Sequence, residues 1–163
     1  MRRKSFQDMN CSVAQALEVV GEWWTMLIVR DCLLGVTRFD DFQERLGIAR
    51  NVLTERLDHL VARGVLRRVA YQDHPPRHDY RLTEKGRDLW LVVNALRQWG
   101  DRWEAGDGPP VVVEHLACGR PTTIVPTCAE CAGVLDARSL RALPGPGASE
   151  RPSAELGLLT PAR

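Results

Sequence analysis

Two pairs of metal-ligand residues lie close together in the last third of the 163-residue chain. Each pair has two intervening residues, and each lies near a glycine or proline that favours a turn. Cysteine and histidine with this spacing are typical ligands of tetrahedral zinc. Four ligands fill the coordination sphere, which predicts a structural metal; the alternative is a degenerate ribbon with free thiols. The candidate zinc ligands are His115, Cys118, Cys128 and Cys131.

The other two cysteines occupy different environments. Cys11 directly precedes a predicted helix, where the helix dipole stabilises a thiolate and can make a cysteine reactive. The alternative for Cys11 is a small buried residue. Cys32 follows Ile28 by four residues on an apolar helical stripe, which predicts a core position. Five cysteines are an odd number, so they predict a reducing compartment and not a disulfide framework.

A third group of residues has the chemistry of DNA contact. Arginine can fork to guanine, asparagine to adenine, and glutamate can accept a hydrogen bond from cytosine. The candidates for base edges are Arg50, Asn51, Thr54 and Glu55. The candidates for phosphate are Arg38, Arg56, Arg77 and His78, with Arg77 also a candidate for the minor groove. The alternative for each is a solvated surface side chain.

The charge distribution supports this interpretation, although the net charge is only +1. Residues 45–81 hold eight arginines against four acidic residues, with no lysine among the cations. Arginine suits forked contacts to phosphate and guanine. The sequence has neither a glycine-rich phosphate loop nor a nucleophile elbow, so we do not expect an enzyme.

The residues around these candidates predict the elements that must position them. Within residues 38–64, apolar side chains three and four apart predict two short helices that end at Gly47 and Gly64. Residues 66–71 and 78–82 alternate as strands do, and the prolines between them predict the tip of a hairpin. With two earlier helices at about 12–20 and 22–34, the fold class is mainly α with a small β-wing: a winged helix-turn-helix.

Polar residues at helix starts predict three caps. Ser12 and Gln15 form a predicted capping box, Thr37 and Asp40 form another, and Thr83 begins the last helix.

The last helix, at about residues 83–105, is predicted to join two copies of the chain. Its apolar residues follow the 3, 4, 3, 4 spacing of a heptad seam. A small domain has too little core to bury so wide a face, which favours a homodimer that matches two-fold DNA half-sites. The alternative is packing within its own domain. The seam consists of Leu89, Val92, Leu96, Trp99 and Trp103.

Composition divides the chain into five predicted segments. They are an arm (1–10), the winged-helix domain (11–105), a linker (106–110), a Cys/His ribbon-like module (111–142) and a disordered tail (143–163) rich in proline, glycine and serine. There is no run of about 18 apolar residues, and the start lacks the apolar stretch of a secretory signal. We therefore expect a cytoplasmic protein with no membrane partner.

Seven stretches of residues 11–105 carry a family resemblance. They are Cys11–Val13, Val20–Arg30, Arg38–Phe42, Val52–Leu57, Gly64–Leu66, Pro75–Gly86 and Trp99-Gly100. Together they resemble the HxlR-type transcriptional regulators, which are MarR-like winged-helix proteins. One departure is Ala49, which stands where the family usually has serine or another capping residue and which cannot cap.

The resemblance implies a dimeric DNA-binding regulator whose second central helix reads the major groove and whose wing reaches the neighbouring minor groove. Several HxlR-type regulators sense oxidants through a cysteine at the position of Cys11, by a disulfide with the partner subunit or a small thiol. We therefore expect a homodimeric repressor on a pseudo-palindromic operator in double-stranded DNA. No cofactor is expected to be required, and structural zinc is a candidate ligand of the Cys/His module. Two alternatives stay open: a regulator switched through Cys11, and a protein-interaction module that uses the wing and the Cys/His ribbon.

Overall fold

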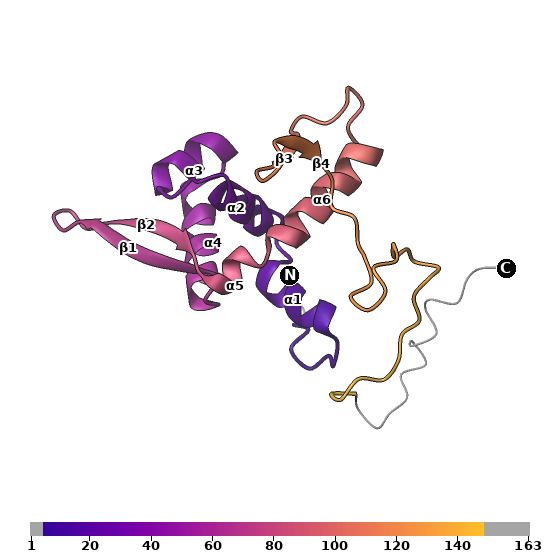
Figure 1. Ribbon diagram of the computed structural model, residues 1–163. Helices are drawn as coiled ribbons and strands as arrows, with labels where there is room; N and C mark the ends of the chain where they lie inside the picture. Colours follow the sequence, from indigo (N-terminus) through magenta and orange to yellow (C-terminus); the bar gives the residue numbers. More distant parts are fainter. Residues whose placement is uncertain (1–4, 149–163) are drawn as a thin grey trace. The chain divides into compact units, whose positions relative to one another are not determined.

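The computed structural model describes residues 5–148, and the chain divides into two compact units, Met1–Gly106 and Asp107–Arg163 (Figure 1). Most of the tail expected at 143–163 and the first four residues of the arm lie outside the described residues. The first unit contains α1 (Ser12–Val20), α2 (Trp23–Leu33), α3 (Phe39–Leu46), α4 (Arg50–Ala62), β1 (Leu66–Gln72), β2 (Arg77–Leu82), α5 (Glu84–Arg87) and α6 (Trp90–Trp103). The second contains β3 (Val113–His115) and β4 (Arg120–Thr122).

The core of the first unit forms where α2, α3 and α4 meet. Gly47 ends α3 with a left-handed backbone (φ 62°), and the buried Ile48 fills the corner that follows. The predicted apolar stripes of both helices are confirmed, because the leucines of α4 and Phe42 of α3 are inaccessible to solvent. The buried apolar residues of this core are Ile28, Val29, Phe42, Ile48, Leu53, Leu57, Leu60, Val65 and Leu66.

One carboxylate is fully buried beside this core. Asp31 of α2 accepts hydrogen bonds from Arg30 (2.7 Å) and from Arg45 of α3 (3.4 Å). A buried charge is tolerated when it is paired in this way, and here the pairing links α2 to α3.

The hairpin of β1 and β2 is the predicted wing, and it extends away from the helices in Figure 1. The strands are antiparallel, with Leu66 opposite Leu82 and an irregularity between Ala70 and Gln72. The backbone N–H of Tyr80 donates to the carbonyl of Thr37 (2.7 Å), so β2 is also tied to the segment before α3. The winged helix-turn-helix is therefore confirmed, and its wing is fixed to the helix pair.

Two of the three predicted caps are wrong. Cys11 and not Ser12 is the N-cap of α1, and Arg38 and not Thr37 is the N-cap of α3; neither makes a side-chain cap. In a capping box, the side chain of Gln15 would bond to the backbone of the N-cap residue. Instead, its side-chain amide donates to three backbone carbonyls of the arm (2.9–3.2 Å), those of Phe6, Gln7 and Met9.

The predicted helix at 83–105 is two helices. Thr83 caps α5 as expected, since its hydroxyl oxygen accepts from the N–H of Gly86 (3.1 Å). The chain then turns at Asp88 and Leu89 before α6 begins. Within the described part of the chain, no helix is long and apolar enough to cross a membrane.

The second unit has little to hold it together. Its strands β3 and β4 pair from Val113–Thr122 to His115–Arg120, and Thr127 bridges to Val134. No side chain is buried between residues 107 and 148. A unit of this kind lacks the apolar core that stabilises an ordinary domain.

Gly86 offers a test of how the wing meets α5. A Cβ at this position would lie 2.2 Å from the carbonyl oxygen of Val65 and 2.9 Å from the side chain of Leu82. Gly86→Ala should therefore lower the free energy of unfolding by about 1–3 kcal/mol, because backbone must move to admit a methyl group. Chemical denaturation measures this change. The exposed neighbour Glu84 is the control, and Glu84→Ala should cost less than about 1 kcal/mol; equal losses would contradict the close approach.

Candidate nucleic-acid interface

The face of α4 opposite its leucines is polar and open to solvent. Asn51, Thr54, Glu55 and Asp58 are all exposed, as the helical spacing predicts. The hydroxyl of Thr54 donates to the carbonyl of Arg50 (2.9 Å), and Asp58 pairs with Arg68 of the wing. The helix therefore presents short polar groups of mixed type on a rigid support.

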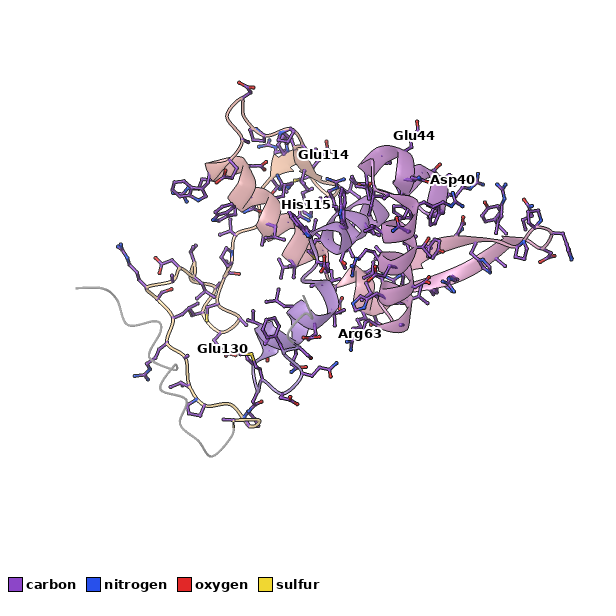
Figure 2. All side chains as sticks on the ribbon, turned by 180° about the vertical axis from the view of Figure 1, so that it is seen from behind. Asp40, Glu44, Arg63, Glu114, His115 and Glu130 are labelled. Atoms are coloured by element: carbon purple, nitrogen blue, oxygen red, sulfur yellow. The ribbon has the colours of Figure 1, made fainter. Side chains whose placement is uncertain are left out.

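Arg50 begins this helix and is oriented by α3. Its guanidinium lies 4.7 Å from the ring centroid of Phe39, and one nitrogen is 3.8 Å from a carboxylate oxygen of Asp40. Figure 2 shows Asp40 on the outer side of α3. Ala49 is the N-cap of α4 and supplies no side-chain acceptor, so no side chain covers the first-turn amides. The entrance of α4 is thus cationic and uncapped.

Two arginines are placed on the wing or against it. The guanidinium of Arg38 lies 4.9 Å from the ring centroid of Tyr71, which holds it against β1. Arg77 is exposed at the start of β2, near the tip, and the next residue, His78, is half-buried.

Sequence reasoning missed a pair of arginines on the wing. Arg67 and Arg81 are both exposed and lie directly opposite each other on β1 and β2. Like charges in this position destabilise a sheet, and Arg81 is paired with the carboxylate of Asp79 (2.9 Å), which offsets part of the repulsion. The alternation of the strands contained the signal, but only the pairing register brings these two residues together.

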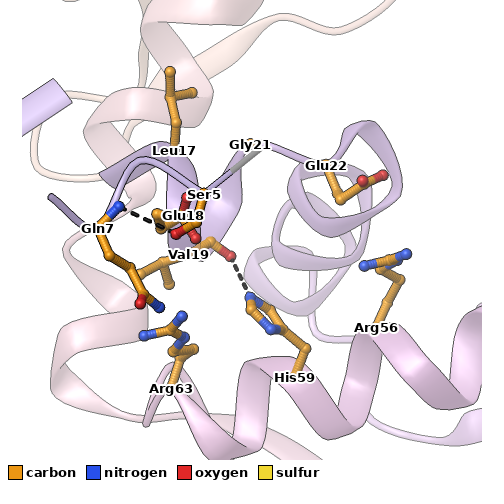
Figure 3. A pocket seen from close by; sticks show the side chains of 10 residues that line it. All are labelled: Ser5, Gln7, Leu17, Glu18, Val19, Gly21, Glu22, Arg56, His59 and Arg63. Carbon is orange, nitrogen blue, oxygen red and sulfur yellow. Dashed lines mark hydrogen bonds between the residues drawn. The ribbon is translucent and has the colours of Figure 1, made fainter. Parts of the chain in front are cut away.

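Arg56 is placed apart from the other predicted DNA residues. It lines a cavity of about 330 Å³ with His59 and Arg63, opposite the turn between α1 and α2 (Figure 3). Its side chain is 18% exposed and lies 3.2 Å from Glu55, and its buried Nε has no hydrogen-bond partner. The structure therefore does not group Arg56 with Asn51 and Thr54.

The two cysteines of the first unit differ as their positions predict. Cys11 is exposed at the N-cap of α1. Cys32 packs against the core, and burial together with the nearby charge of Asp31 raises the pKa of its thiol to about 12. Cys32 is therefore protonated at neutral pH and a poor nucleophile.

The predicted zinc ligands come together as two pairs. Cys118 Sγ lies 3.5 Å from His115 Nδ1. Cys128 accepts hydrogen bonds from the backbone N–H groups of Cys131 and Glu130, and these lower the pKa of its thiol. Between residues 5 and 148, no three His, Cys, Asp or Glu side chains converge as a group that would hold a metal ion. His115 is the last residue of β3, in the β3–β4 hairpin (Figure 2).

A helix pair with one exposed polar helix, followed by an arginine-bearing hairpin, defines a winged-helix DNA-binding protein. Comparison with known families places it further. The family model HxlR-like helix-turn-helix matches residues 19–107, and the chain belongs to this family.

Individual relatives agree with this assignment. The uncharacterized HTH-type transcriptional regulator MT3179 of Mycobacterium tuberculosis (strain CDC 1551 / Oshkosh) is 44% identical over 137 residues, which cover 83% of this chain and 87% of that one. The crystal structure of PA1607, a candidate transcription factor, matches with a TM-score of 0.76 and 39% identity, over 86% of this chain and 99% of that one. The oxidized form of the redox regulator HypR matches with a TM-score of 0.51 and 34% identity, over 55% of this chain and 93% of that one.

The resemblance drawn from the sequence is thereby confirmed. The protein is a transcriptional regulator with a helix-turn-helix DNA-binding domain, and its family and relatives form a non-enzymatic class.

Proposed function

We propose that the protein is a homodimeric repressor that reads a pseudo-palindromic operator in double-stranded DNA. The observation that carries the proposal is the solvent-exposed polar face of α4, with Arg50 at its entrance and Arg68 of β1 paired with Asp58 on that face. A bound dimer can occlude a promoter without further parts, and this is the reason for preferring repression to activation.

The contacts to DNA divide by chemistry. Arg50, Asn51, Thr54 and Glu55 read base edges in the major groove, where forked and paired hydrogen bonds distinguish bases. Arg38, His78 and the uncapped first turn of α4 bind phosphate, which fixes the register of the helix. Arg77 at the wing tip enters the minor groove. Arg67 and Arg81 extend the phosphate surface along the wing. Arg56 is left out of this set because it faces the cavity beside α1.

The dimer is built on α6. No residue of this helix is buried, and along its predicted seam Leu96 is 55% exposed, Trp99 58% and Trp103 62%. Leu89, the N-cap of α6, and Val93 of the same helix pack against the core. Contiguous apolar surface of this kind is uncommon on a monomer, and a second copy of the same seam would cover it.

A second candidate function is redox control through Cys11. Its thiol is exposed at the N-cap of α1 and is therefore accessible to an oxidant. HypR, similar over 55% of this chain, is a redox regulator with solved oxidized and reduced forms. Two thiols, from two copies or from Cys11 and a small thiol, would each lose a proton and an electron to an oxidant and join as a disulfide.

The operator reading is tested by selecting random double-stranded DNA with the full-length, reduced protein at low salt. An inverted repeat should be enriched, and a reporter whose promoter overlaps it should fall when the protein is expressed. Arg50→Ala and Asn51→Ala should each weaken binding by about 1–3 kcal/mol and relax the preference at defined positions.

Two further variants sharpen this test. Arg77→Ala should weaken binding to all sequences and reduce the slope of log affinity against log salt by about one. Arg63→Ala, at the C-cap of α4 and in the cavity beside α1, is the control, and it should leave the base preference unchanged. If no sequence is enriched at low salt, the operator proposal is wrong. That result would favour the alternative that the protein is an interaction module that binds another protein through the wing.

The dimer is tested by light scattering after gel filtration. The wild type should have the mass of two chains, and Leu96→Glu should convert it to a monomer because the charge cannot be buried in an apolar seam. Leu34→Glu, at an exposed leucine of the α2 C-terminus, should leave the dimer intact. A dimer that survives both Leu96→Glu and Trp99→Glu would place the interface elsewhere.

The redox candidate is tested with diamide, which accepts two electrons and two protons from a pair of thiols. Oxidised wild type should lose operator binding and regain it with excess reductant. Cys11→Ser should keep binding after oxidation, and Cys32→Ser should respond as the wild type does, because its thiol stays protonated. A response retained in Cys11→Ser would rule out Cys11 as the sensor.

A further inference from the structure

We propose that the cavity beside α1 binds a small zwitterion of the α-amino acid class. The cavity lies on a different side of α4 from Asn51 and Thr54, and a ligand there goes beyond the operator-reading function. The argument rests on the opposite charges of the two walls, on a buried donor that no group of the described chain satisfies, and on the size of the cavity.

One wall of the cavity is a basic stripe of α4. Arg56, His59 and Arg63 are three and four residues apart, so they share one side of the helix. The ring of His59 bonds through Nε2 to the carbonyl of Val19 (3.0 Å), which ties this wall to the end of α1. Within the described part of the chain, the side chain of Arg63 forms no ion pair. This wall therefore offers a guanidinium group to a negatively charged ligand atom.

Arg56 adds a hydrogen-bond donor that lacks a partner. Its side chain is 18% exposed, and one terminal nitrogen pairs with Glu55 (3.2 Å). Its Nε is buried and has no hydrogen-bond partner among the described residues. Leaving a buried donor unsatisfied is unfavourable, whereas a charge-assisted bond from this nitrogen to a carboxylate oxygen is strong. The basic wall thus suits the carboxylate of a ligand.

The opposite wall is acidic. Glu18, near the end of α1, and Glu22, the N-cap of α2, lie across the cavity from the basic stripe (Figure 3). Glu18 accepts the backbone N–H of Phe6 through one carboxylate oxygen. Two carboxylates on this wall disfavour a simple anion, and two arginines on the other wall disfavour a simple cation. A molecule that carries both an ammonium group and a carboxylate matches both walls.

The size and the lining of the cavity favour a small, polar ligand. Its volume of about 330 Å³ is at the lower end of the range for ligand pockets, about 300–1,000 Å³. Among the described residues, Leu17 and Val19 alone supply apolar side chains to the lining. Ser5 and Gln7 of the arm also line it, and Gln15 holds the arm by donating to the carbonyl of Gln7 (3.0 Å). These features favour an amino acid with a short side chain, such as glycine, alanine or serine.

The test is isothermal titration calorimetry of the full-length, reduced protein with glycine, L-alanine and L-serine, in the absence of DNA. At least one of them should bind with a Kd below about 1 mM. The same ligand should raise the temperature of thermal unfolding, because a ligand of the folded state stabilises it. Its N-acetyl analogue lacks the ammonium group and its amide lacks the carboxylate, so each should bind at least about tenfold more weakly.

Two variants change one wall each. Arg63→Ala and Glu22→Gln should each weaken binding by about tenfold or more, because each removes one charged partner of the zwitterion. Arg63→Lys keeps the charge and should bind more tightly than Arg63→Ala, which distinguishes loss of a partner from loss of structure. Arg87→Ala and Glu44→Gln remove the same charges from exposed residues outside this cavity and should bind as the wild type does.

Three outcomes would overturn the proposal. The first is binding weaker than about 1 mM for all three amino acids. The second is equal binding of an amino acid and its N-acetyl analogue, which would mean a site for simple anions. The third is unchanged binding in both Arg63→Ala and Glu22→Gln, which would place the ligand elsewhere. Because no DNA is present, failure here leaves the operator proposal standing, and failure of operator selection leaves the amino-acid site standing.

Discussion

Burial of the α4 leucines is the constraint on which the rest of the DNA-binding unit depends. Leu53, Leu57 and Leu60 are inaccessible to solvent, and together they fix the rotation of α4 about its own axis. Because a helix has two opposite faces, that rotation forces Asn51 and Thr54 outward. Recognition chemistry is therefore placed by residues that never touch DNA, and the apolar core determines the angle at which base edges are read.

The wing and the entrance of α4 depend on this core through α3. The corner at Gly47 and Ile48 sets where α4 begins, and α3 supplies Phe39 and Asp40, which orient Arg50. The backbone bond from Tyr80 to Thr37 ties the wing to the segment before α3. Buried Asp31 links α2 to α3 through Arg45. A shift of α3 would therefore move both surfaces that we propose for DNA.

Two parts of the chain expose side chains that a single copy of the chain does not bury or pair. The seam of α6 exposes large apolar side chains, whose burial by a second copy is favourable in proportion to the area covered. Between residues 107 and 148, the second unit has no buried side chain, and His115 and Cys118 lie side by side at its surface. The apolar seam of α6 favours association with another apolar surface. Exposed thiol and imidazole groups are instead the kind of atoms that bind a metal ion.

The sequence by itself determined what depends on short-range pattern. The stripes of α3 and α4, the polar face of α4, the wing and the Thr83 cap all follow from residues three or four apart, or from alternation over a few positions. The two wrong caps and the break at Asp88 and Leu89 show where this reasoning fails. Gln15 bonds to a carbonyl of the arm that lies outside the local capping pattern. Near the break, Gly86 packs closely against Val65 and Leu82, which are distant from the helix pattern that was used for the prediction.

Tertiary structure alone decided the rest, because the deciding partners lie far apart in sequence. Arg56 belongs to α4 like Asn51, but the turn between α1 and α2 makes its side of the helix the wall of a cavity. Arg67 and Arg81 become neighbours only through strand register. The spacing of His115, Cys118, Cys128 and Cys131 was readable in the sequence as two pairs. The turns that hold each pair depend on backbone hydrogen bonds and left-handed residues, and within the described residues the two pairs do not form one metal site.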